Sequence, residues 1–333
     1  THLFKVPIEA QAWGILLGGF VQFFFQLPFL KRIGLLPVPR LNWKDPGVNR
    51  VLKLMLPSLF GASVAQISIL INTVFASFLR VGSITWLYFS ERLAYFPLGV
   101  FGVALLTILL PHLSSQHAKK SNDGFSSILN WGIRCNLLIG IPASLTMLIL
   151  SGPLVATLFA HGKFSTFDAI MTQRSVITYA IGLQSFMLVK ILSAAFYSKQ
   201  DTKTPVKIAL ITVVINIILN ATLIIPLAHA GLALASSLGS WFNSIALIYV
   251  LHKRNIYRFQ SGWGLFAGRL LAANIILGLF LWWQGGDLTT WLGWHWPQRL
   301  LHLLYLAISS IVLYVISLGI LGIRFSDFKA KFS

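Results

Sequence analysis

The chain has 333 residues, of which 56% are hydrophobic and only 10% are charged. Because about a quarter of the residues in a soluble domain are charged, this composition excludes a water-soluble protein. The net charge of +18 does not indicate nucleic-acid binding, because the basic residues lie in short connections between apolar runs, where polytopic membrane proteins place them.

Long apolar runs follow one another along the whole sequence. Each run can cross ~30 Å of hydrocarbon as an α-helix at 1.5 Å per residue, and the runs lack the apolar-polar alternation of barrel strands. We therefore predict an all-α, polytopic transmembrane helical bundle. In chain order, the nine expected spans are 8–30, 54–79, 84–110, 127–150, 173–197, 206–226, 230–251, 263–283 and 300–322.

The distribution of Lys and Arg predicts the orientation of these spans, because basic residues concentrate in cytoplasmic loops. Seventeen of them lie in every second connection and in the C-terminal end. The other connections and the N-terminal end carry five, which are Lys5, Arg80, Lys163, Arg174 and Arg299. We therefore expect the N-terminal end outside and the C-terminus in the cytoplasm.

Local signals predict several further features. Residues 153–159 are expected to form a short helix at the membrane interface. Ser165 and Asp168 resemble a capping box that starts the next helix, and Thr204 followed by Pro205 predicts an N-cap at Thr204 with the proline at the first helical position. An outer aromatic belt is expected from five tryptophans, Trp282, Trp283, Trp291, Trp294 and Trp296.

Sparse acidic residues and a single cysteine argue against an enzyme. The chain has eight acidic residues, most of them in expected loops, and no pair is spaced to set two carboxylates on one intramembrane face. The histidines lack metal-ligand spacing, and the sequence has no Gly-rich phosphate loop. Cys135 is the only cysteine, which excludes an intrachain disulfide or a thiolate metal cage. We predict no catalytic residue, no metal and no cofactor.

Glu91 and Arg92 are the most informative charges inside a predicted span. A charge that faces lipid costs about 2.5 to 3.5 kcal/mol, so both side chains should face protein or water. Pro97, Gly99 and Gly102 follow in the same span and predict a bend or hinge. These residues alone leave two interpretations of Arg92 open, a cavity-lining contact for an anion and a structural or snorkelling arginine.

Other polar residues in the spans are weaker candidates. Lys190 and Arg134 could line the same cavity, but each lies near a cytoplasmic helix end and could also reach the headgroups by snorkelling. Four asparagines are interpreted as polar links between helices rather than as ion ligands: Asn72, Asn216, Asn220 and Asn243.

Three motifs make the sequence similar to a known family. They are ERLAYFPLGVFGVALLTILLPHLS at residues 91–114, LFAHGKFS at 158–165 and AFYSKQDTKTP at 195–205. In this order they resemble the MviN (MurJ) family of lipid II flippases, which belongs to the multidrug/oligosaccharidyl-lipid/polysaccharide exporter superfamily. The resemblance extends over essentially the whole chain.

The resemblance implies a two-lobed exporter fold with an extra C-terminal helix pair. Family members have fourteen transmembrane helices, and the nine spans expected here would correspond to the last nine. On this basis residues 1–32 hold the last helix of the first lobe, 49–252 the second six-helix lobe, 262–323 the helix pair and 324–333 a cytoplasmic tail. The implied location is the bacterial inner membrane.

The resemblance also implies a transporter that moves lipid II, the undecaprenyl-diphosphate-linked peptidoglycan precursor, to the outer leaflet by alternating access. Arg92 matches a cavity arginine that contacts the diphosphate or sugar, with Glu91 beside it. Tyr95 stands where many relatives have a second acid, so a carboxylate role there does not carry over. Expected partners are lipid II, membrane lipids and, by analogy with the superfamily, a coupling cation. The alternative is a polysaccharide-unit or multidrug exporter of the same superfamily.

Overall fold

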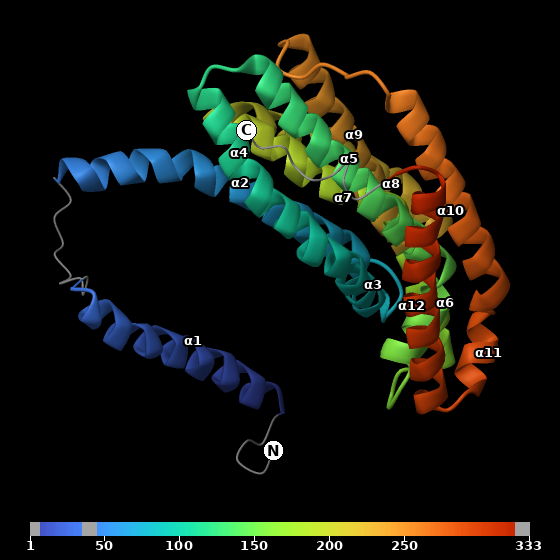
Figure 1. Cartoon of the computed structure of the whole chain (residues 1–333). Coiled ribbons are helices and arrows are strands. Elements are labelled where there is room, and N and C mark those ends of the chain that lie inside the picture. The colour runs from blue at the N-terminus through green and yellow to red at the C-terminus, as the bar shows by residue number, and fades with distance from the viewer. Residues whose placement is uncertain (1–6, 35–44, 324–333) are drawn as a thin grey trace. The chain divides into compact units, whose positions relative to one another are not determined.

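The computed structural model describes residues 7–34 and 45–323, and every regular element in this part of the chain is a helix (Figure 1). The chain forms two compact units, Thr1–Met55 and Leu56–Ser333. Helix α1 (Pro7–Arg32) belongs to the first unit, and α2 (Pro46–Ser77) begins there and continues into the second.

The remaining helices all belong to the second unit. They are α3 (Ser83–Pro97), η1 (Leu98–Gly102), α4 (Val103–Ala118), α5 (Asn122–Ile149), α6 (Ser151–Leu158), α7 (Thr166–Ser198), α8 (Lys203–Leu227), α9 (His229–Lys253), α10 (Trp263–Gly285), α11 (Leu288–Gly293) and α12 (Trp296–Ile320).

The predicted all-α membrane architecture is confirmed. Within the described ranges, eight helices are long and apolar enough to cross a membrane, and they match eight of the nine expected spans. One of the eight is a composite of α3, η1 and α4. The ninth expected span, 54–79, falls on α2 (Pro46–Ser77), in which Gln66–Ser77 is an apolar helical segment.

Helix α7 is the centre of the second unit, because it packs against α3, α4, α5, α6 and α9. Its contact with α9 uses small residues. A Cβ atom added at Gly182 would lie 2.4 Å from the Ser237 Oγ, and the Ser185 hydroxyl donates to the Ser240 Oγ at 2.8 Å. Small residues let helix backbones approach closely in lipid, where the hydrophobic effect does not drive helices together.

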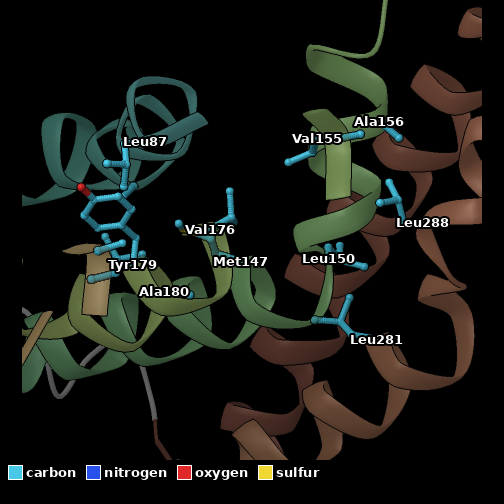
Figure 2. Close-up of a cluster of buried hydrophobic side chains, with 14 of the residues drawn as sticks. Leu87, Met147, Leu150, Val155, Ala156, Val176, Tyr179, Ala180, Leu281 and Leu288 are labelled. Atoms are coloured by element: carbon cyan, nitrogen blue, oxygen red, sulfur yellow. The ribbon is translucent and has the colours of Figure 1, made fainter. Parts of the chain in front are cut away.

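A cluster of buried apolar side chains joins α7 to its neighbours. Figure 2 shows part of it, with Leu87 above the Tyr179 ring and Leu281 beside Leu150. Helices α10 and α12 pack against each other; α10 also contacts α5, and α12 contacts α6. The C-terminal helices are therefore attached to the bundle through α5 and α6.

Of two predicted local features, one is confirmed in part and one in full. The short helix expected at 153–159 is present as α6, but Val155 and Ala156 are fully buried within the bundle, and its place at the membrane interface stays a prediction. The capping box at the start of α7 is present, because the Asp168 N–H donates to the Ser165 Oγ at 3.1 Å and the Ser165 N–H donates to the Asp168 Oδ2 at 2.9 Å.

The predicted N-cap at Thr204 is wrong. Helix α8 begins at Lys203, and the capping acceptor is the Asp201 carboxylate. The Thr204 N–H donates to Asp201 Oδ1 at 3.0 Å, and the Thr204 hydroxyl donates to Asp201 Oδ2 at 2.6 Å. Each carboxylate oxygen of Asp201 accepts one of these bonds, and a carboxylate charge is favoured at a helix N-terminus.

The expected aromatic belt is wrong at Trp291. This ring is fully buried, and its Nε1 donates to the Gly285 carbonyl at 2.6 Å. Its burial follows from the turn between α10 and α11, which folds the indole over Gly285. Three of the other belt tryptophans are exposed, Trp282, Trp283 and Trp296.

Candidate functional site

A cavity of about 480 Å³ lies among α2, α3, α7, α8 and α9, and we call it the central cavity. Its wall combines one carboxylate and one ammonium group with neutral hydrogen-bonding side chains. The polar and aromatic lining residues are Ser68, Asn72, Glu91, Tyr95, Tyr179, Phe186, Lys190, Thr212, Asn216, Ser236, Ser240 and Asn243.

Glu91 and Lys190 face this cavity from α3 and α7. Glu91 is half-buried, and Tyr95, which lines the same cavity, follows it one helical turn later. Across the described ranges the recorded ion pair is the one between Arg254 and Asp201, so Glu91 and Lys190 are not paired with each other there. Since unpaired charges inside a membrane are costly, both are candidates for contact with a ligand or water.

The structure places Arg92 and Arg134 outside the lining of the central cavity. Arg92 is exposed on α3, and its guanidinium lies over the Tyr88 ring, 4.8 Å from the centroid. Arg134 donates to the Ser261 carbonyl at 3.3 Å and lies 5.2 Å from the Trp263 ring centroid. Arg134 thus links α5 to the segment that precedes α10.

The predicted hinge residues lie in or directly before an irregular helical turn. Helix α3 ends at Pro97, and Leu98–Gly102 forms η1, one turn of π-helix, before α4 begins. Proline removes a helical hydrogen bond, and π turns occur as single-turn insertions in α-helices. A Cβ atom at Gly99 would meet nothing within 4 Å, whereas at Gly102 it would lie 3.0 Å from the Leu98 Cδ1. Movement at this turn stays a prediction.

An asparagine network forms part of the cavity wall. The Asn220 Nδ2 donates to the Asn72 Oδ1 at 2.8 Å and to the Asn216 Oδ1 at 3.0 Å. The Asn72 Nδ2 in turn donates to the Ser236 Oγ at 2.9 Å. These bonds join α2, α8 and α9, which confirms the interpretation of three of the four asparagines as links between helices.

Sequence reasoning missed the role of Arg299, which it counted as an external loop residue. This side chain is only 9% exposed and donates to four backbone carbonyls. They are those of Ala156 at 2.8 Å, Ala160 at 3.2 Å, Leu292 at 2.8 Å and Trp294 at 2.9 Å. The guanidinium therefore connects the C-terminal ends of α6 and α11, where helix dipoles favour a cation.

Sequence comparisons relate the chain to a defined family. The family model described as "Lipid II flippase MurJ" matches residues 2–297. The chain is 44% identical over 324 residues to the probable lipid II flippase MurJ of Vibrio cholerae serotype O1, an alignment that covers 97% of this chain and 62% of the relative. It is 41% identical over 324 residues to the Haemophilus influenzae protein of the same name, covering 96% and 63%. The chain thus spans less than two thirds of the length of these relatives.

A solved structure shows the same fold. Lipid II flippase MurJ in an inward closed conformation superposes with a TM-score of 0.67 at 23% identity, over 88% of this chain and 58% of that one. Taken with the family model, which matches most of the sequence, this places the chain in the lipid II flippase MurJ family.

Proposed function

We propose that this chain is part of a lipid II flippase that moves the lipid-linked peptidoglycan precursor from the inner to the outer leaflet of a bacterial cytoplasmic membrane by alternating access. The central cavity carries the proposal, because it presents Glu91 and Lys190 between membrane-spanning helices, where charges mark transport pathways. The names of the relatives support it. Translocation requires the protein to bind the lipid and to change conformation, and it requires no covalent chemistry. A transporter of this kind needs no catalytic residues.

The charges on and beside the central cavity suit a substrate that carries a diphosphate and polar sugars. Arg92 is exposed, and among the described residues its guanidinium lies against the Tyr88 ring, an arrangement that leaves N–H donors for parallel hydrogen bonds to diphosphate oxygens. Lys190 offers a point charge on the other wall, and Glu91 accepts from hydroxyl or amine groups. We assign Arg92 as the principal headgroup contact, with Glu91 and Lys190 as weaker contacts. Arg134, which lies outside the central cavity and is bonded to the Ser261 carbonyl, is the weakest candidate.

The proposal extends to the organisation of the chain. Residues 1–32 would hold the last helix of a first lobe, 49–252 a second lobe, 262–323 a C-terminal pair and 324–333 a tail, as the last nine of fourteen helices. The fraction of the relatives that is matched supports this assignment. The excess of Lys and Arg in alternate connections supports an external N-terminal end and a cytoplasmic C-terminus. A coupling cation is included by analogy with the exporter superfamily.

Depletion and complementation test the assignment of Arg92. Full-length protein with Arg92→Ala should fail to restore growth of a depleted strain while it accumulates to the normal level. Arg258→Ala, which removes an exposed charge outside the central cavity, should restore growth. Full complementation by the Arg92→Ala protein would overturn the assignment of this residue.

A separate measurement tests the transported substrate. Depletion of the protein should reduce the lipid II that is accessible at the outer leaflet and should arrest peptidoglycan synthesis. Unchanged lipid II exposure would overturn the flippase proposal and favour a polysaccharide-unit or multidrug exporter.

A further inference from the structure

A second pocket, of about 460 Å³, lies where α3, α7 and α9 begin and α8 ends. We call it the terminal pocket. It shares no lining residue with the central cavity, and the proposed transport function does not use it. Its lining includes three basic side chains, Arg80, Arg174 and His229, and no acidic one.

The two arginines of the terminal pocket lack carboxylate partners. Neither takes part in the ion pair recorded for the described part of the chain. The guanidinium of Arg80 lies over the Phe167 ring, 4.6 Å from its centroid. The nearby Asp168 carboxylate already accepts from the Trp86 Nε1 at 2.8 Å and from Ser165. Within the described part of the chain, the two arginines therefore carry charges that no direct carboxylate contact neutralises, although Asp168 stays ionised nearby.

The backbone adds to this positive potential. Helix α3 starts after Gly82 and α9 starts after Ala228, and neither N-cap residue supplies a side-chain hydrogen bond to the first turn. The Ser83 N–H donates to the Arg80 carbonyl at 3.1 Å and the Gly231 N–H to the Ala228 carbonyl at 3.0 Å, but the aligned peptide dipoles still give each helix N-terminus a partial positive charge that favours anions. These dipoles support the two arginines, whose unpaired charges are the main attraction for an anion.

The rest of the terminal pocket is apolar. Trp86, Phe167, Met171, Pro226 and Leu227 contribute to its wall. It also lies at the ends of membrane-spanning helices, the depth at which lipid headgroups meet water. A free inorganic ion gains nothing from an apolar wall. The glycerol and the upper part of the acyl chains of a lipid would pack against it.

We propose that the terminal pocket binds the phosphate group of an anionic membrane lipid, with Arg80 and Arg174 as its charged contacts. Arginine is suited to this role, because its fork of N–H donors matches two phosphate oxygens and its charge persists at all relevant pH values. The site is separate from the substrate contacts assigned to Arg92, so it does not depend on the transport proposal.

Lipid titration of the full-length protein followed by native mass spectrometry tests the site. Dioleoylphosphatidylglycerol should bind the parent protein, and dioleoylglycerol, which lacks the phosphate, should bind at least tenfold more weakly. At about fivefold per basic contact, the Arg80→Gln/Arg174→Gln double variant should weaken phosphatidylglycerol binding about 25-fold. Lys163→Gln removes an exposed charge at the same end of the helices but outside the pocket, and it should leave binding unchanged.

Three results would overturn the proposal. One is equal affinity of the double variant and the parent for phosphatidylglycerol. Another is equal binding of dioleoylglycerol and phosphatidylglycerol. The third is displacement of the lipid by equimolar inorganic phosphate, which would show a site for the free anion. If the double variant unfolds, the single variant Arg174→Gln and the charge-preserving Arg174→Lys replace it, with about fivefold loss expected for the former and less for the latter.

Discussion

Gly182→Ala is expected to destabilise the contact between α7 and α9. The added Cβ would lie 2.4 Å from the Ser237 Oγ and 2.7 Å from its Cα. Rotation of the serine does not relieve the second contact, and it would break the bond that the Ser237 hydroxyl donates to the Thr178 carbonyl at 2.7 Å. The two helices must therefore separate locally by roughly 1 Å to restore van der Waals contact.

The magnitude follows from three contributions. Overpacking a close contact costs about 1 to 3 kcal/mol, and the lost hydrogen bond costs about 1 kcal/mol. Replacing glycine by alanine within a helix returns about 1 kcal/mol. We expect the free energy of unfolding of Gly182→Ala to fall by about 2 kcal/mol.

Gly268→Ala in α10 is the matched control, because a Cβ at Gly268 would meet nothing within 4 Å. It should keep or slightly raise the stability of the parent. Titration of the full-length proteins with SDS in mixed micelles, followed by tryptophan fluorescence, gives the free energies of unfolding. If Gly182→Ala proves as stable as Gly268→Ala, the inferred close packing of α7 on α9 is wrong.

Three further changes test other contacts. Arg299→Met should lower the free energy of unfolding by about 3 kcal/mol in the same titration, because four carbonyls lose a charged donor; parent-like stability would contradict these bonds. Asn220→Leu should cost about 1 kcal/mol, as is usual for an interhelical hydrogen bond in lipid, and Asn243→Leu on the same cavity should cost less. Partial burial opposes ionisation of Asp201, but the bonds from Thr204 and Arg254 outweigh it and lower the pKa of this carboxyl. Its contribution to stability is therefore complete above the unfolded pKa of about 3.9 and is lost as pH falls through the lower folded pKa, so thermal midpoints of Asp201→Asn should depend less on pH in that range.

The positions of the helices could be predicted because a membrane leaves the backbone few choices. Every N–H and carbonyl in lipid must be satisfied within the chain, so long apolar runs become helices whatever their neighbours are. The capping box at Ser165 and Asp168 could also be predicted from the sequence, because its two residues lie three positions apart. The cap of α8 could not be predicted in the same way. Thr204 and Asp201 are both residue types that cap helices, and only the three-dimensional structure shows which side chain accepts the hydrogen bond.

The candidate site depended more on tertiary packing. The cost of a charge in lipid was enough to predict that Glu91 faces protein or water. That Glu91 and Lys190 line one cavity depends on the packing of α3 against α7, far apart in sequence. The role of Arg299 could not be predicted either. Two of its carbonyl partners, on Ala156 and Ala160, lie more than a hundred positions earlier in the sequence, so no local sequence pattern indicates these bonds.

The π-helical turn between α3 and α4 makes this span tolerant of a one-residue deletion at one place. A π turn holds one residue more than an α-helical turn, so Leu98–Gly102 includes a residue that a regular helix would not contain. Deleting one residue there would restore a regular helix and leave the residues after it in nearly the same orientation relative to α3. Leu105, Leu109 and Leu113, which are buried, would then stay in the core. The same deletion within the regular part of α4 would rotate every later residue by about 100° and turn later core residues away from the bundle.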